Sequence, residues 1–286
     1  MEDVREAVTE WKDVLEWVLQ RYVERPLLIG GHKFHLRVYV LVAGCLSVYL
    51  YEDAFVLLAA RKFPGKSTDA EGESASVQSQ LSHITNTCTS AAVLGDKFEE
   101  HRHVRFLSEL PWLLEKWDTL PRGDGPAAVA RVYDGMRTAL AALFGSFRGQ
   151  FERFMPLANA FELFGVDFLV DEDMHPWLLE FNPGPDMGQA RNRLQPLMQA
   201  IVDDTVDTMV QQRDWADPAR RLASQTREPR PVDMEESVPG LRPRPLRPFD
   251  AANRKAPCWK AGEGRRNGWD CVFEEVWVGS QTAARE

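Results

Sequence analysis

The sequence predicts an α+β fold in which a mainly antiparallel sheet is flanked by helices. Residues 161–183 contain two apolar runs, rich in aromatic and branched side chains, around an acidic turn segment, and this is the pattern of a β-hairpin. Residues 27–61 contain further strand-like runs separated by turn signals. Apolar residues recur every three or four positions over residues 4–18, 126–155 and 194–209, which predicts three amphipathic helices.

Length and composition exclude several classes of protein. The 286 residues suffice for one large domain or two modest ones. The net charge is −9, so broad non-specific binding to nucleic acid is not expected. No apolar run is long enough to span a bilayer, and the acidic N-terminus lacks the basic and apolar regions of a signal peptide. The four cysteines show no CxxC spacing, so we expect free thiols and a cytoplasmic location.

Composition divides the chain into three parts. Residues 1–212 hold the predicted strands and helices, and a flexible polar loop is expected over residues 64–80. Residues 213–256 are rich in Pro and Arg and poor in apolar residues, which predicts a disordered linker. Residues 257–286 carry enough Trp and other apolar side chains to dock back onto the main domain, and binding to a partner protein is the alternative.

A strand with a basic face is predicted early in the chain. Residues 19–23 are strand-like, and a glycine pair at residues 30–31 then predicts a tight turn. Lys33, His35 and Arg37 alternate with apolar residues, so their side chains share one face of the strand. Arg binds phosphate oxygens in a bidentate manner and Lys acts as a point charge, which suits a polyphosphate ligand. A solvated sheet face is the alternative.

A phosphate-binding P-loop is excluded. The sequence GKS at residues 65–67 is similar to the end of that motif. The motif also needs a Gly five positions before the first of these residues, where this chain has Ala60, and no helix pattern follows.

Helical patterns precede the hairpin. Residues 97–118 are partly helical, and Pro111 must interrupt or restart that helix. The helix over residues 126–155 has Pro126 at its first position and ends before Pro156. Its aromatic stripe is assigned to core packing.

The hairpin brings three oxygen-bearing side chains together. Glu180 and Asn182 are two apart on the second strand, so they point to the same face. A turn centred near residues 173–174 places Asp167 opposite Glu180, with Cβ atoms about 4.5–5.5 Å apart. Two carboxylates at that distance repel each other, and a bound divalent cation would remove the conflict; oxygen ligands of this kind suit magnesium. The alternative is a surface hairpin whose acids face water.

Five short runs of sequence carry a resemblance to a known family. They are residues 20–23 (QRYV), 26–29 (PLLI), 31–40 (GHKFHLRVYV), 83–86 (HITN) and 177–182 (WLLEFN). In this order the runs resemble the tubulin-tyrosine ligase family. The resemblance implies an ATP-grasp fold that holds ATP and magnesium between two sheet layers. It also implies a reaction in which ATP phosphorylates a carboxylate and an amine attacks the acyl phosphate to form an amide.

The resemblance assigns roles to residues of this chain. It implies metal ligands at Asp167, Glu180 and Asn182, the set also inferred from the hairpin. Arg37 and Glu180 are the expected catalytic residues, because charge on the transferred phosphoryl group is stabilised by metal and cations. A protein substrate is the expected partner, and tubulin is one candidate. The expected ATP-binding residues lie in the adenine hinge, on the basic strand and in the HITN run: Gln20, Arg21, Tyr22, Val23, Lys33, Arg37, Thr85 and Asn86.

The chain also departs from the family pattern. His35 replaces an Asp that many members have, and Leu57 replaces an Arg. Because the chain begins almost at the adenine hinge, the N-terminal domain and most of the lid over ATP are expected to be missing. Two functions are therefore compatible with the sequence. One is a ligase that joins an amino acid to a protein carboxylate, and the other is a catalytically weak or inactive member that binds proteins.

Overall fold

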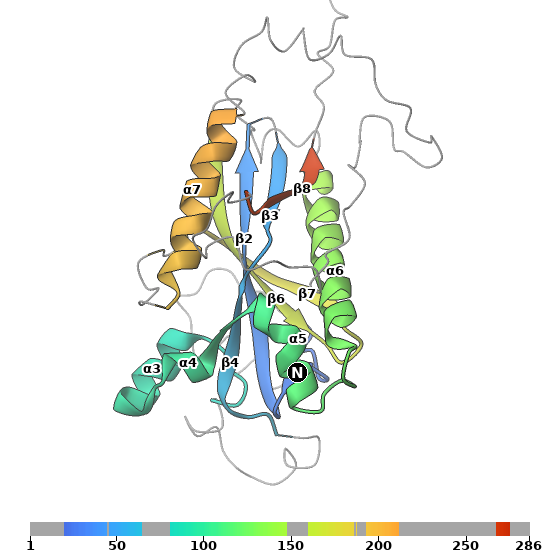
Figure 1. Ribbon diagram of the computed structural model, residues 1–286, viewed down its shortest axis with the longest axis vertical. Helices are drawn as coiled ribbons and strands as arrows, with labels where there is room; N and C mark the ends of the chain where they lie inside the picture. The colour runs from blue at the N-terminus through green and yellow to red at the C-terminus, as the bar shows by residue number, and fades with distance from the viewer. Residues whose placement is uncertain are drawn as a thin grey trace, which may run out of the picture.

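An antiparallel sheet forms the centre of the protein. The computed structural model describes residues 20–44, 46–64, 81–147, 160–185, 187, 193–211 and 267–274. Over these residues the chain forms an eight-stranded sheet in which all paired strands are antiparallel, with helices packed against it (Figure 1). The predicted α+β class with a mainly antiparallel sheet is therefore confirmed.

The twelve-residue strand β2 (His32–Ala43) lies in the middle of this sheet. Strands β4 (Phe55–Lys62) and β3 (Ser47–Tyr51) pair with successive parts of one of its edges. Strand β6 (Phe161–Val170) pairs with the other edge, and β7 (Pro176–Pro183) pairs with β6. The predicted hairpin is thus formed by β6 and β7, and it is joined directly to the strand that carries the basic residues.

Three short strands complete the sheet. Strand β1 (Leu28–Ile29) pairs with the start of β2 across Gly30 and Gly31, whose positive φ angles of 58° and 84° favour glycine. Strand β8 (Trp269–Glu274) extends the sheet beyond β3. Strand β5 (Val104–Phe106) extends it beyond β4 and was not predicted, because three residues between helical segments carry no clear strand pattern.

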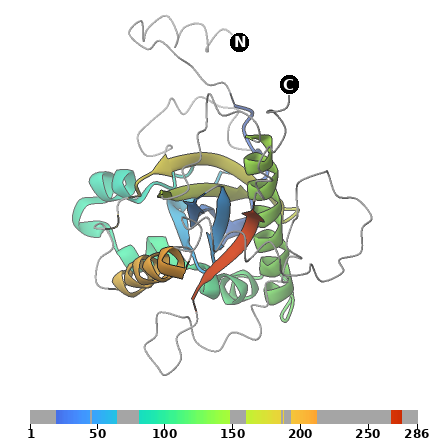
Figure 2. The same ribbon diagram turned by 90° about the horizontal axis from the view of Figure 1, so that it is seen from above.

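Alternation along β2 gives the sheet two different faces. The even-numbered residues of β2 from 34 to 42 are buried in one hydrophobic cluster, which α5 (Leu110–Lys116) and α6 (Gly125–Ser146) cover. Tyr39 belongs to a second cluster, which includes residues of α7 (Gln195–Gln211). Figure 2 shows α6 and α7 on different sides of the strands. The basic or titratable side chains of Lys33, His35 and Arg37 have the same parity as Tyr39 and lie on this second face.

The long helices follow the predicted patterns. Helix α6 matches the start of the predicted helix at residues 126–155, and residues 148–159 lie outside the described part of the chain. Helix α7 matches the pattern over residues 194–209. Pro111 lies in the first turn of α5, so it restarts the helix as predicted. The other helical segments in the described part of the chain are α3 (Thr87–Leu94), α4 (Glu100–His103) and two short 3-10 helices, Gly95–Lys97 and Leu107–Glu109.

Two predicted elements near the N-terminus, a helix and a strand, are not found among the described residues. The helix predicted over residues 4–18 lies outside the described residues. The strand predicted over residues 19–23 was wrong for residues 20–23, which have no regular structure. The next contact with the sheet is a single bridge between Pro26 and Asp171, and Pro26 has no N–H with which to extend a ladder. Among the described residues, no helix combines the length and the apolar character that crossing a membrane requires.

Buried polar contacts hold β8 against the rest of the sheet. The carboxylate of Asp204 on α7 accepts hydrogen bonds from the Tyr51 hydroxyl (2.6 Å) and from the backbone N–H of Gly268 (3.1 Å). Arg137 of α6 is fully buried and pairs with Asp270 at 3.2 Å. Part of the predicted tail is therefore a strand of the sheet. The three-part division of the chain stays a prediction, and residues 213–256 lie outside the described residues.

Candidate functional site

A row of charged side chains crosses three strands near the middle of the sheet. Arg37 of β2 lies opposite Asp167 of β6, and Asp167 lies opposite Glu180 of β7. The predicted cross-strand pair of Asp167 and Glu180 is confirmed. Asn182 follows on the same strand, and its Nδ2 donates to Oε1 of Glu180 over 2.9 Å. The structure thus brings four of the predicted site residues together.

A β-bulge at Leu179 gives this pairing. On the turn side of the bulge, Phe168 lies opposite Leu178. On the other side, Asp167 lies opposite Glu180, so Leu179 is the extra residue of β7. The bulge directs Glu180 to the face on which Asp167 lies.

The bulge also compensates for the position of the turn. The ladder next to the turn is centred on Asp173, half a residue from the predicted centre, and without an extra residue Asp167 would face Leu179. The packing of two apolar side chains of β7 reveals the bulge. Leu178 and Phe181 both pack against the core although they are three positions apart, which a regular strand does not allow.

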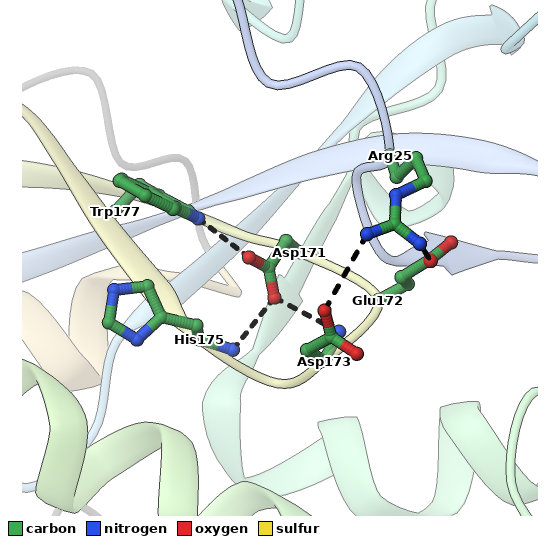
Figure 3. A network of polar contacts seen from close by, with 6 residues as sticks. All are labelled: Arg25, Asp171, Glu172, Asp173, His175 and Trp177. Atoms are coloured by element: carbon green, nitrogen blue, oxygen red, sulfur yellow. Dashed lines mark hydrogen bonds and ion pairs between the residues drawn. The ribbon is translucent and has the colours of Figure 1, made fainter.

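The carboxylate of Asp171 closes the hairpin turn (Figure 3). Its Oδ1 accepts hydrogen bonds from the backbone N–H groups of Asp173 (3.0 Å) and His175 (2.9 Å), and its Oδ2 accepts one from Nε1 of Trp177 (2.7 Å). Burial would raise the pKa of Asp171, but these hydrogen bonds outweigh it and lower the pKa. One side chain therefore accepts three hydrogen bonds within the turn that sets the site's register.

Replacing Asp171 with Ala is expected to lower the free energy of unfolding by about 1–2 kcal/mol, because three N–H donors lose their acceptor. Urea denaturation measures the change. Asp173→Ala is the matched control, since its side chain is 76% exposed and lies 3.8 Å from Arg25, so a change below about 0.5 kcal/mol is expected. Equal losses in the two variants would contradict the role given to Asp171.

Arg37 and Asp167 form a bidentate ion pair. Nε and Nη2 of Arg37 donate to Oδ1 and Oδ2 of Asp167, the second over 2.8 Å. Burial alone would raise the pKa of Asp167, but the hydrogen bonds from Arg37 outweigh it and lower the pKa. The same hydrogen bonds raise the pKa of Arg37. Gly165 leaves room for this pair, because a Cβ there would lie 3.3 Å from Cδ of Arg37.

Asp167, Glu180 and Asn182 supply oxygen donors that fit a hard divalent cation. Asp167 is buried and Glu180 is exposed, and Glu180 is close enough to affect the pKa of Asp167. Among the described residues no group of three or more His, Cys, Asp or Glu side chains converges as a metal site. The candidate set is therefore two carboxylates and a carboxamide. Magnesium typically binds one or two carboxylates and completes its shell with water and substrate phosphates, so the set fits magnesium.

His35 lies beside this row with one ring nitrogen paired and the other unpaired. Its Nδ1 lies 2.6 Å from Oγ1 of Thr85. Its Nε2 faces Oδ1 of Asp167 at 3.7 Å and has no hydrogen-bond partner in the described part of the protein. Only 8% of the side chain is exposed. Burial lowers the pKa of His35 to about 4 despite the opposing charge of Asp167, so the ring is neutral at neutral pH.

Folding stability is expected to fall as the pH drops from about 6.5 to about 4. The unfolded chain binds a proton on His35 in this window and the folded chain does not, because the folded pKa is the lower one. The contribution of neutral His35 to the free energy of unfolding is fully present above pH 6.5. It is lost as the pH falls toward 4 and amounts to about 3 kcal/mol. Asp167, whose pKa is lowered, adds a separate loss below the ordinary carboxyl range.

Urea denaturation at a series of pH values measures this dependence. His35→Gln is expected to reduce the slope above pH 4 and to leave the part due to His103, whose pKa is also lowered by burial. The slope below pH 4, where Asp167 is protonated, is expected to stay. An unchanged slope above pH 4 in this variant would contradict the assignment to His35.

Lys33 contacts the predicted adenine hinge rather than the Asp167 row. Its Nζ donates to the Tyr22 hydroxyl over 2.9 Å and lies 4.6 Å from the centre of the Tyr22 ring. The same hydroxyl lies 2.9 Å from Nδ1 of His83. Burial lowers the pKa of Lys33. Tyr22 thus joins the hinge, the basic strand and the HITN run.

The other predicted ATP-binding residues have different environments. Thr85 contacts His35, as described above. Asn86 caps α3, because its Oδ1 accepts from the backbone N–H groups of Cys88 (2.9 Å) and Thr89 (3.2 Å). Sequence reasoning missed this cap, although Asn just before a helix is its usual signal. The nucleotide roles stay predictions, and the remaining hinge residues are exposed or half-buried: Gln20, Arg21 and Val23.

The two residues that depart from the family pattern are neighbours in the structure. His35 of β2 lies directly opposite Leu57 of β4, and both are buried. Cross-strand neighbours of opposite charge stabilise a sheet as a pair, and losing one alone would leave a buried charge unpaired. In this chain both positions are neutral, so no unpaired charge remains between them. The sequence alone does not show that the two changes are neighbours, because it does not fix the pairing of β2 with β4.

Comparison with known proteins gives matches to one family over most of the chain. The model of the tubulin-tyrosine ligase family matches residues 6–216. The chain is 31% identical over 199 residues to a probable tubulin–tyrosine ligase of Schizosaccharomyces pombe, covering 69% of this chain and 43% of the relative. It is 31% identical over 196 residues to a probable tubulin polyglutamylase of Bos taurus, with coverage of 68% and 38%.

A third relative, a tubulin monoglycylase of Mus musculus, is 29% identical over 202 residues, with coverage of 69% of this chain and 20% of the relative. The matched region of these three proteins is therefore between one fifth and about two fifths of their own length.

Proposed function

The chain belongs to the tubulin-tyrosine ligase family, and on that premise we propose that it carries the catalytic part of an ATP- and magnesium-dependent ligase. The proposed reaction joins an amino acid to a protein carboxylate through an acyl phosphate. Its antiparallel sheet with flanking helices is the ATP-grasp-like α+β class expected of this family. The observation that carries the proposal is the row of Arg37, Asp167 and Glu180 across three adjacent strands, with Asn182 beside it.

Each residue of the row has a chemical task in the proposal. Asp167, Glu180 and Asn182 would hold magnesium, which when bound offsets the negative charge of the polyphosphate. Arg37 offers a planar fork of donors for phosphoryl oxygens, and 27% of its side chain is exposed to a ligand. Lys33, buried beside Tyr22, supplies a second cation on the same face of β2.

The relatives support a protein substrate and leave the added amino acid open. Their names describe a probable tubulin–tyrosine ligase, a probable tubulin polyglutamylase and a tubulin monoglycylase, so the names share tubulin as the substrate but differ in the amino acid added. We therefore propose tubulin as the first candidate acceptor.

A thermal-shift titration tests the proposal. ATP with magnesium is expected to stabilise the protein by about 2.7 kcal/mol when the nucleotide is present at 100 times its dissociation constant. ATP with EDTA is the control for the metal, and magnesium alone is the control for the nucleotide. Absence of any magnesium-dependent stabilisation by ATP would contradict the ligase and favour a protein-binding module without catalytic activity.

A further inference from the structure

The ring of His35 keeps a polar atom unpaired in a buried place. Its Nε2 has no hydrogen-bond partner in the described part of the chain, and it faces Oδ1 of Asp167 at 3.7 Å. A buried polar group without a partner typically costs about 1–3 kcal/mol. A small movement would bring the two atoms to about 2.9 Å, the usual length of an N–H···O hydrogen bond.

The surroundings of the ring favour a hydrogen on Nε2. The hydroxyl of Thr85 lies 2.6 Å from Nδ1 and can donate to it. A lone pair on Nε2 would face the negative Oδ1 of Asp167, whereas an N–H there points a donor at an acceptor. Thr85, His35 and Asp167 therefore form a line of hydroxyl, imidazole and carboxylate.

Arg37 and His35 both face the same oxygen of Asp167. Arg37 donates to Oδ1 through Nε and to Oδ2 through Nη2, so it holds both carboxylate oxygens. A metal ion on Asp167 would repel the guanidinium, and phosphate oxygens offer Arg37 another bidentate acceptor. Because the Arg37 side chain is partly exposed, it can turn to such a ligand, whereas His35 is held inside by Thr85.

We propose that His35 is a positioning residue that takes over Oδ1 of Asp167 when Arg37 leaves it for a phosphoryl group. Asp167 would then be free of the guanidinium and could hold a metal ion, and a neutral donor adds no positive charge beside it. This inference rests on the proposed magnesium and ATP site and gives a specific role to His35, which the sequence placed only on the basic face of the strand. Thr85 in turn fixes the orientation of the His35 ring.

Manganese binding in the presence of ATP, followed by electron paramagnetic resonance on the full chain, tests this role. His35→Asn keeps a polar atom near the position of Nδ1 and loses the one near Nε2, whereas His35→Gln keeps a donor near Nε2. His35→Asn is expected to weaken manganese binding about tenfold or more, the usual effect of removing the partner of a metal ligand. The manganese affinity of His35→Gln is expected to be closer to that of the wild type than to that of His35→Asn.

Two further measurements separate positioning from folding. Thr85→Val leaves the ring in place without its hydroxyl partner and is expected to weaken manganese binding in the same direction. In nitrogen-15 NMR spectra of the wild type, the hydrogen of His35 is expected on Nε2, with its exchange slowed when magnesium and ATP are added. His101, whose side chain is 61% exposed on α4, provides matched Asn and Gln control variants that should bind manganese like the wild type.

The outcomes distinguish this inference from the proposed function. Equal manganese affinities of His35→Asn, His35→Gln and the wild type would overturn the positioning role and leave the ligase proposal intact. Equal losses in His35→Asn and His35→Gln, or a hydrogen on Nδ1 in the wild type, would also overturn it. A wild-type protein that binds no manganese with ATP would overturn both.

Discussion

Replacing Arg37 with Met is expected to lower the free energy of unfolding by about 3–5 kcal/mol, because it leaves the buried carboxylate of Asp167 without its charged partner. It is also expected to abolish the stabilisation by ATP and magnesium, since Arg37 is the donor fork proposed for phosphoryl oxygens. Urea denaturation and thermal shift measure the two effects.

A double-mutant cycle separates the ion pair from other consequences of losing Arg37. Asp167→Asn removes the charge that would be left unpaired, so the double variant with Arg37→Met is expected to be more stable than the sum of the single losses predicts, by about 1–3 kcal/mol. Arg37→Lys keeps the positive charge but loses the two-pronged set of N–H donors. Its loss of unfolding free energy is expected to lie between those of the wild type and Arg37→Met. A loss of less than about 0.5 kcal/mol for Arg37→Met would contradict a buried, stabilising pair.

Replacing Glu180 with Gln is expected to abolish the magnesium-dependent part of nucleotide binding with little change in stability. Glu180 is exposed, and its carboxylate is one of the two negative charges available to a cation in the candidate site. Gln keeps the size of the side chain and its acceptor oxygen, so the effect reports on charge. Thermal shift with ATP, with and without magnesium, measures it.

Glu162→Gln is the matched control for Glu180→Gln. Glu162 is an exposed residue of the same hairpin, but it lies opposite Val42 at the far end of β6. Its replacement should leave the magnesium-dependent shift as in the wild type. A normal magnesium-dependent shift in Glu180→Gln would remove Glu180 from the metal site, and equal losses in both variants would show a general effect of charge.

Local patterns predicted the strands that carry the site, and the register of the hairpin followed from them. The pairing of Asp167 with Glu180 was predicted correctly from a turn centre that was half a residue off, because a bulge at Leu179 made up the difference. The bulge became visible only when Leu178 and Phe181 were seen to pack on the same side. Alternation alone could not predict it, because a bulge breaks the period on which that reasoning depends.

Contacts between distant segments could not be predicted in the same way. The pairing of Lys33 with Tyr22 and of His35 with Thr85 depends on how a loop and a hinge fold over β2, and neither segment carries a pattern that fixes its position. The buried state of His35 also follows from these contacts. His35 shares its strand face with Lys33 and Arg37, so the sequence pattern favours a face exposed to water. Only tertiary packing excludes water from the His35 ring.

The position of β8 has a consequence for how the protein is made. Tyr51 pairs with Trp269, more than two hundred positions later in the chain, so the edge of β3 stays open until those residues have been synthesised. During that time β3 is an open edge that other nascent chains can pair with, and the carboxylate of Asp204 lacks its Gly268 donor. Pairing of β8 with β3 is thus expected to follow the folding of the rest of the sheet, as a slow step set by the long sequence separation.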